Sequence, residues 1–234
     1  MFLTPSAFVR AFFNLGLTKS ILFPSGYAIN GLEDAVLECA NRCDQKTYIE
    51  LGANDGIRQS NTKRLEELGW SGILIEPVPK LFRRLTKTRS KSNSFYQRAC
   101  VPFDFEQDHI EITMLDLMSS SKELVHKDFD FGNQVSSGSK HMITNTRPEK
   151  VKVQTATLSE LIRESKFGPE FGILSLDVEG AELSVLEGLD LSTHTFEFMI
   201  IETSQEARVT DYLQPFGYML SRKLSGHDYL FTRK

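Results

Sequence analysis

At 234 residues the chain is long enough for one domain with a well-packed core, or for one domain with an appendage. Its 40% apolar and 25% charged residues exclude a disordered, collagen-like or coiled-coil protein, and its net charge of -4 disfavours a general nucleic-acid binder. The three cysteines have no C-x-x-C spacing, so they indicate neither a disulfide framework nor a zinc site and fit a reducing, cytoplasmic setting.

Residues 1–46 predict an N-terminal helical arm that covers an edge of the core. Their apolar start is interrupted by Pro5 and by charged and amide side chains, so it is too polar to span a bilayer. It also lacks the basic start and the cleavage site of a signal peptide. The alternative is contact with a membrane surface or a partner, because several phenylalanines could form an exposed aromatic face.

From residue 47 to the C-terminus, short β-rich runs alternate with helical patterns. This alternation indicates an α/β domain with a mostly parallel sheet and helices on both faces. The runs 217–224 and 227–233 are separated only by Ser225 and Gly226 and predict an antiparallel hairpin at the sheet edge. The other strands are expected at 47–52, 72–77, 94–101, 171–178 and 196–203, and helices at 61–69, 79–87 and 181–189.

The segment from about 104 to 150 does not follow this alternation. It holds one further strand pattern at 109–115 and then a long polar stretch. A connection of that length in a compact domain is either disordered or functional. We expect an insertion that forms a lid over the site.

The stretch ELGANDG, residues 50–56, is the first candidate binding element. Gly52 and Gly56 follow an apolar strand and precede a helix, so the backbone can turn tightly and approach a ligand. The spacing is not the G-x-G-x-x-G of dinucleotide binding, and Glu50 stands just before the first glycine. An acid there suits a cationic ligand, and S-adenosylmethionine carries a sulfonium and an ammonium group.

Two further acids stand where the carboxyl ends of strands are expected. Glu76 closes the run GILIEP, the place where a doubly wound sheet holds the ribose of a nucleoside cofactor. Asp177 closes the run FGILSLD, and Glu179 and Glu182 follow it, so Asp177 and Glu179 are placed to face the ligand crevice. For Glu182, a favourable interaction with the N-terminus of the next helix is an equal alternative.

Together, ELGANDG with SNT, GILIEP and LDVEGAELSVLEG resemble, in this order, the FkbM family of S-adenosylmethionine-dependent methyltransferases from about residue 47 to the C-terminus. The resemblance implies the Rossmann-like class I methyltransferase fold, with a seven-stranded sheet whose antiparallel strand comes from the C-terminal hairpin. It implies O-methylation of a hydroxyl on a sugar, a glycan or a secondary metabolite.

Carried onto this sequence, the resemblance places ELGANDG and SNT at the methionine end of the cofactor, Glu76 at the ribose and Asp177 near the transferred methyl group. The segment QRAC would lie by the adenine, although Arg98 stands where the wider class often has an acid. The residues predicted to contact the cofactor are Glu50, Gly52, Ala53, Asn54, Asp55, Gly56, Ser60, Asn61, Glu76, Pro77, Arg98, Ala99 and Asp177.

A hydroxyl acceptor gains from a general base, and Asp177 or Glu179 is the first candidate. His141, in the expected lid, competes because its ordinary pKa suits proton transfer near neutrality. A magnesium-assisted mechanism at the same acids is an alternative, but we assign no metal ligands. Residues 77–103 contain seven basic residues and no acid, which indicates either a solvated helix face or a docking surface for an anionic small-molecule or glycan acceptor.

Two other functions stay open at this point. One is a catalytically silent, methyltransferase-like module that binds a partner. The other is a nicotinamide-dependent oxidoreductase, which the missing second glycine of G-x-G and the acid at Glu50 disfavour. No motif for base methylation and no aromatic platform for single strands is present, so no nucleic-acid partner is expected.

Overall fold

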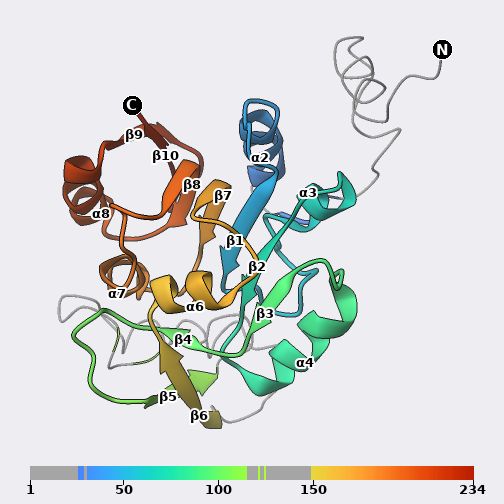
Figure 1. The fold of residues 1–234 in the computed structure, drawn as a ribbon, viewed down its shortest axis with the longest axis vertical. Helices are drawn as coiled ribbons and strands as arrows, with labels where there is room; N and C mark the ends of the chain where they lie inside the picture. Colours follow the sequence, from blue (N-terminus) through green and yellow to red (C-terminus); the bar gives the residue numbers. More distant parts are fainter. Residues whose placement is uncertain (1–25, 29–30, 115–120, 122–123, 125–148) are drawn as a thin grey trace.

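The structure, a computed structural model, describes residues 26–28, 31–114, 121, 124 and 149–234. Its centre is a seven-stranded sheet with the order β3-β2-β1-β7-β8-β10-β9 (Figure 1). The strands are β1 (Thr47–Leu51), β2 (Ser71–Ile75), β3 (Ser94–Tyr96), β7 (Glu170–Leu176), β8 (Thr195–Glu202), β9 (Tyr218–Lys223) and β10 (Asp228–Arg233).

The strand directions confirm the predicted sheet. β3, β2, β1, β7 and β8 pair in parallel, whereas β10 is antiparallel to both β8 and β9. The hairpin loop is longer than the two residues expected, because β9 ends at Lys223 and the amide of Leu224 donates to the carbonyl of Asp228.

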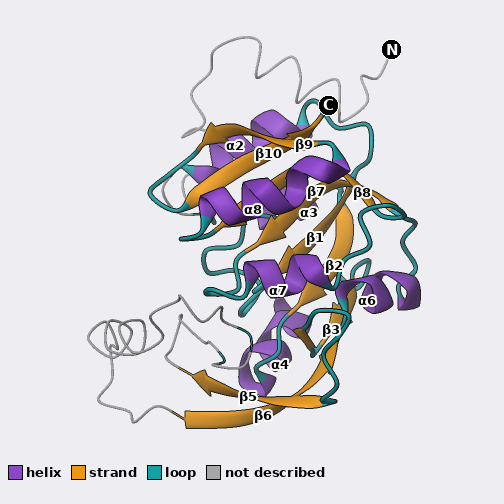
Figure 2. Ribbon diagram, turned by 90° about the vertical axis from the view of Figure 1, so that its left-hand side faces the viewer, coloured by secondary structure: helices purple, strands orange, loops and turns teal. Residues whose placement is uncertain are grey.

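Helices cover both faces of this sheet, as predicted (Figure 2). One face packs against α6, α7 and α8, which supply buried Leu161, Val185 and Val209. The other packs against α2, α3 and α4, which supply Val36, Leu65 and Leu85. The helices are α2 (Leu32–Ala40), α3 (Lys63–Glu67), α4 (Pro79–Thr88), α6 (Leu158–Glu164), α7 (Glu182–Glu187) and α8 (Glu206–Leu213), followed by the 3₁₀ turn η2 (Gln214–Phe216).

The single strand expected at 94–101 is wrong, because it is two strands in different sheets. β3 pairs with β2 in the main sheet, but β4 (Ala99–Cys100) pairs with β6 (Glu149–Ala156), which in turn pairs with β5 (His109–Met114). The strand pattern at 109–115 is therefore confirmed as β5. The sequence reading missed β6, whose first residues it placed in the lid.

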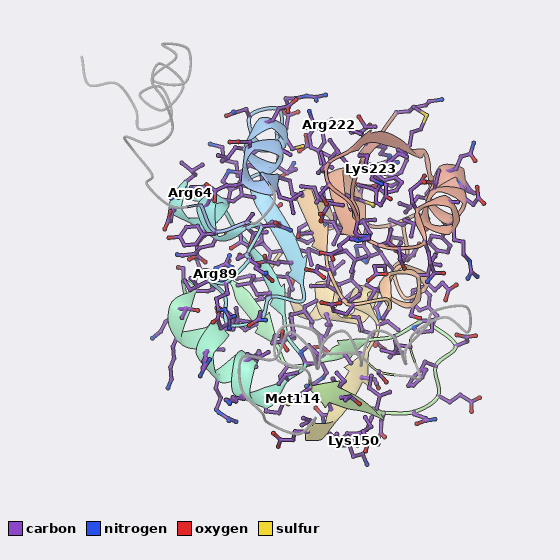
Figure 3. All side chains as sticks on the ribbon, turned by 180° about the vertical axis from the view of Figure 1, so that it is seen from behind. Arg64, Arg89, Met114, Lys150, Arg222 and Lys223 are labelled. Atoms are coloured by element: carbon purple, nitrogen blue, oxygen red, sulfur yellow. The ribbon has the colours of Figure 1, made fainter. Side chains whose placement is uncertain are left out.

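Most of the segment expected to form a lid, and most of the N-terminal arm, lie outside the described residues. Figure 3 marks the small sheet by Met114 and Lys150, at the opposite end of the molecule from Arg222 and Lys223 of the hairpin. Within the described ranges, no helix is long and apolar enough to cross a membrane.

A buried arginine joins the strand β1 to both neighbouring helices. Arg89 lies between α3 and α4 (Figure 3), and its side chain is 0% exposed. Its guanidinium contacts the carboxylate of Glu50 on β1 at 3.0 Å and that of Glu66 on α3 at 2.9 Å. It also donates to the hydroxyl groups of Tyr48, at 2.8 Å, and Thr62, at 2.9 Å.

This network keeps the carboxylate of Glu66 ionised inside the core. Burial opposes ionisation of Glu66, but the charge of Arg89 and a hydrogen bond from Lys63 outweigh it and hold the pKa of Glu66 below its usual value. A buried charge that loses its partner is costly, because neither water nor a counter-ion replaces the lost contact.

We therefore predict that Arg89→Met lowers the free energy of unfolding by about 3–5 kcal/mol, because it leaves Glu50 buried without a cation and Glu66 with Lys63 alone. Urea unfolding of the variant measures this loss. The matched control is Arg84→Met on the exposed face of the same helix, with an expected change within about 0.5 kcal/mol. Equal effects of the two substitutions would show that the buried network contributes little.

Candidate functional site

A cleft opens at the carboxyl ends of β1, β2 and β7, the edge at which open α/β sheets bind their ligands. The space within it, about 920 Å³, includes open solvent. Eight of the residues predicted from sequence line it: Gly52, Asn54, Glu76, Pro77, Arg98, Ala99, Asp177 and Glu179.

Gly52 sits where the turn after β1 touches the turn after β7. Its φ is +77°, and a Cβ atom built there would lie 1.9 Å from the carbonyl oxygen of Asp177. The amide of Asp177 also donates to the carbonyl of Leu51 at 3.3 Å. Only glycine fits this close approach. The turn after β1 and Asp177 are therefore held together by backbone contact.

The turn after β1 continues through a second unusual backbone position. Asn54 has a φ of +50°, and its side-chain oxygen accepts the amide of Asp55 at 2.7 Å. The carboxylate of Asp55 accepts the amides of Ile57 at 3.1 Å and Arg58 at 2.9 Å. Asp55 therefore stabilises the turn itself, and Asn54 is the member of the pair that lines the cleft.

Glu76, the residue after β2, is buried and tied to both sides of the cleft. Its carboxylate accepts the amide of Asn54 at 2.9 Å and the amide of Val78 at 2.8 Å. Burial raises the pKa of Glu76 to about 7, against the effect of these two hydrogen bonds. Each oxygen retains a lone pair, so the carboxylate can still accept a hydrogen bond from a ligand.

The acids after β7 form the opposite wall of the cleft. Burial, and then the charges of Glu202 and Glu179, raise the pKa of Asp177 well above its usual range. Glu182 is buried, and burial raises its pKa to about 7 although it accepts the amide of Gly180 at 2.8 Å. Glu182 thus binds backbone at the start of α7, whereas Asp177 and Glu179 line the cleft.

The structure places Glu50 outside the cleft lining. Its carboxylate accepts the hydroxyl of Ser60 at 3.0 Å, that of Thr62 at 2.7 Å and the amide of Asn61 at 2.9 Å, and it pairs with Arg89. Arg89 therefore compensates the negative charge of Glu50, which we expected to face a cationic ligand. A cofactor contact by Glu50 remains a prediction with a competing structural explanation.

Four other predicted residues support the turn from behind instead of lining the cleft. Ala53 packs in the core, and Gly56 fits against Thr88 and Arg89. Ser60 binds Glu50, and the side-chain amide nitrogen of Asn61 donates to the hydroxyl of Ser175 at 3.0 Å. The side-chain oxygen of Asn61 has no partner among the described residues. His141 lies outside the described residues.

Sequence reasoning missed several residues that line the cleft, among them Arg58, Gln59, Leu81, Cys100, Ile112 and Leu124. They come from loops, from α4 and from the small sheet, and none carries a motif. The only available signal was their nearness in sequence to predicted strand ends. Among the described residues, no group of three or more potential ligands has a geometry that could hold a metal ion.

The sheet order, with a cleft at the carboxyl ends of β1, β2 and β7, is that of the class I methyltransferase fold. The family model described as "Methyltransferase FkbM domain" matches residues 50–222. The chain therefore belongs to the FkbM methyltransferase family. This confirms the family and the cofactor, S-adenosylmethionine, that the sequence predicted.

Two solved structures with a similar fold are distant in sequence. Magnesium protoporphyrin IX methyltransferase from Synechocystis PCC 6803 is 10% identical with a TM-score of 0.44, over 100% of this chain and 99% of that one. A putative RNA methyltransferase from Pyrococcus horikoshii is 11% identical with a TM-score of 0.43, over 87% and 84% of the two chains. Such distant likenesses say nothing about the acceptor. The chain has no match among curated proteins.

We predict that Gly52→Ala destabilises the protein by at least about 2 kcal/mol, because a methyl group would overlap the carbonyl of Asp177 as well as strain the backbone. Gly69→Ala is the matched control. Its φ is also positive, +89°, but a Cβ there meets nothing within 4 Å, so only backbone strain remains, about 1 kcal/mol. Thermal unfolding of both variants measures the difference, and equal losses would contradict the overlap.

Proposed function

We propose that this methyltransferase transfers the methyl group of S-adenosylmethionine to a hydroxyl oxygen of a sugar, a glycan or a hydroxylated secondary metabolite. The observation that carries the proposal is the separation of acids within one cleft. Glu76 lies at the end of β2, and Asp177 and Glu179 lie across the cleft at the end of β7. The end with Glu76 suits the nucleoside of the cofactor. The end with Asp177 and Glu179 suits removal of a proton from the acceptor.

The residues of the cleft fit this cofactor. Glu76 would accept hydrogen bonds from the ribose hydroxyls, and the exposed Gly52 would leave room for the methionine part. When bound, S-adenosylmethionine supplies an electrophilic methyl group. The protein holds the acceptor oxygen in line with that group and keeps water out.

The acceptor class follows from the base. An amine can attack without losing a proton first, but a sugar hydroxyl is a weak nucleophile and gains from a carboxylate that takes its proton. A raised pKa makes Asp177 a stronger base, and it lines the cleft. Asp177 therefore supports O-methylation, with Glu179 as the second candidate for the base.

The basic segment 77–103 has three separate uses in the structure. Arg89 is buried in ion pairs with Glu50 and Glu66, and Arg98 lines the cleft. The other basic residues, Lys80, Arg83, Arg84, Lys87 and Lys91, are exposed on or just after α4. Among the basic residues that the structure describes, Arg58 and Arg98 line the cleft, which supports an anionic group on the acceptor.

We also propose a location for the protein and the extent of its catalytic domain. The three cysteines are free thiols, which supports a reducing, cytoplasmic location. Residues 47–234 are proposed as the catalytic domain, and β5 with Ser121 and Leu124 contributes one wall of the cleft. Family membership disfavours the nicotinamide-dependent alternative, and a silent binding module would fail to bind S-adenosylmethionine.

We predict that Glu76→Ala weakens binding of S-adenosylmethionine tenfold or more, because a hydrogen bond to a charged group contributes about 1.5–3 kcal/mol. Calorimetry on the folded variant measures the affinity. Glu187→Ala, which removes an exposed carboxylate on α7, is the matched control and should bind like wild type. If wild-type protein binds no S-adenosylmethionine, the enzymatic proposal fails and the silent module is favoured.

We predict that Asp177→Asn keeps most of the cofactor affinity and lowers turnover by about 100-fold or more, the usual contribution of a general base. A panel of sugars, glycans and hydroxylated metabolites, assayed with methyl-labelled S-adenosylmethionine, identifies an acceptor for this comparison. Normal turnover by the variant would move the chemistry to Glu179 or elsewhere.

A further inference from the structure

A second acid, Glu202, stands beside Asp177 at the carboxyl edge of the sheet. β7 and β8 pair in parallel, with Leu176 opposite Ile201. The next residue of each strand is an acid, so Asp177 and Glu202 lie opposite one another at the usual strand spacing of about 4.8 Å. Both point to the face that carries α2, α3 and α4, because alternate residues of the two strands pack in that core.

The same row continues onto β10. Asp228, the first residue of β10, is buried and pairs with Glu202 across the antiparallel ladder. The hydroxyl of Ser225 donates to its carboxylate. Three carboxyl groups therefore occupy one row on adjacent strands, and like charges directly opposite one another are destabilising.

The first two members of this row lie close enough to interact. Burial and then the charge of Glu202 raise the pKa of Asp177. Two ionised carboxylates contain only acceptors, so a direct hydrogen bond between these side chains requires a proton between them.

The charged groups around the pair are mostly acids. Glu179 and Glu182 face Asp177 from the turn after β7 and from α7, and Asp228 faces it from β10. Burial and then Asp228 raise the pKa of Glu202, while His227 works in the opposite direction.

Asp177 and Glu202 differ from Glu50 and Glu66 in how their negative charge is compensated. Glu50 and Glu66 each contact the guanidinium of Arg89. Within the described ranges, neither Asp177 nor Glu202 has an ion pair with lysine or arginine. In the free protein, a proton retained by the pair reduces the repulsion between Asp177 and Glu202.

We propose that Glu202 is a positioning residue for Asp177: the two carboxyl groups hold one proton between them, which fixes Asp177 against β8 and leaves the pair with one negative charge. Asp177 lines the cleft and Glu202 does not, so Glu202 acts through Asp177. The role of the pair in catalysis rests on the proposed O-methyl transfer.

In that reaction the acceptor oxygen bonds to the methyl carbon, and the carbon–sulfur bond breaks with its electron pair left on sulfur. The proton of the acceptor hydroxyl passes to the pair, which becomes neutral. A pair that starts with one proton can accept this second one, whereas a fully protonated pair cannot.

The first test measures the melting temperature of wild type and Glu202→Gln from pH 4 to pH 8. The pKa values of Asp177 and Glu202 are raised in the folded protein. At low pH both the folded and the unfolded states are protonated, so the pair does not lower the stability. As pH rises through the folded-state pKa values, the folded protein loses stability. Removing one acid of the pair should relieve this loss. We expect the variant to melt about 3 °C above wild type at pH 8 and no higher than wild type at pH 4.

The control is Glu197→Gln, on the same strand but at its amino end, where the side chain accepts the amides of Asp44 and Gln45. Its difference from wild type should stay constant with pH. If Glu202→Gln does not fold, Asp177→Asn tests the same pair, with the same gain expected at high pH. A loss of stability by the tested variant at every pH would overturn the shared proton and leave Glu202 a purely structural residue.

The second test uses calorimetry with S-adenosylmethionine and S-adenosylhomocysteine at pH 7, each in two buffers of different ionisation enthalpy. The sulfonium charge favours ionisation of the pair, so wild type should release more protons with S-adenosylmethionine than with the uncharged sulfur compound. Glu202→Gln should abolish that difference. A wild-type difference of zero, or one that persists in the variant, would contradict the inference.

The two tests separate this inference from the proposed function. If neither compound binds, the methyl-transfer proposal fails, while the melting temperatures still decide whether the pair shares a proton. If both compounds bind and the melting profiles of wild type and Glu202→Gln differ only by a constant, the function stands and the positioning role of Glu202 does not.

Discussion

The buried guanidinium of Arg89 is the contact on which the geometry of the cleft depends. It joins β1, α3 and the end of α4 through Glu50, Glu66 and the hydroxyl of Tyr48. Glu50 in turn holds the segment of Ser60 and Thr62, which closes the loop that begins at Gly52. A long side chain from a helix end thus sets the shape of a turn that lines the cleft.

Two kinds of buried acid lie at the carboxyl edge of this sheet, and they differ in whether a cation compensates their negative charge. Glu50 forms an ion pair with Arg89 and stabilises the fold. Glu76 and Asp177 meet no cation in the described structure and have raised pKa values. Uncompensated buried carboxyl groups are unfavourable for stability. Both line the cleft, where a positively charged cofactor and the proposed hydroxyl acceptor would contact them.

Local pattern was sufficient for much of the architecture. The strands β1, β2, β7 and β8 are continuous apolar runs, and the acids after β2 and β7 were found because parallel strands present their carboxyl ends to the ligand. The same rule applied to the run FEFMIIET would also have marked Glu202. β6 escaped because it carries lysines and glutamates and pairs only in a small, exposed sheet, and the split of 94–101 depends on which partner each half meets.

The sequence alone determined the class of sheet, the glycine turn, the family and the cofactor, because these depend on residue order and on spacing along the chain. Tertiary structure decided which acids face the cleft. Glu50 looked like a cofactor residue by position, and only the approach of Arg89, 39 residues away, gives its charge another partner. The pairing of Asp177 with Glu202 likewise depends on strand register, which brings together residues that no local pattern connects.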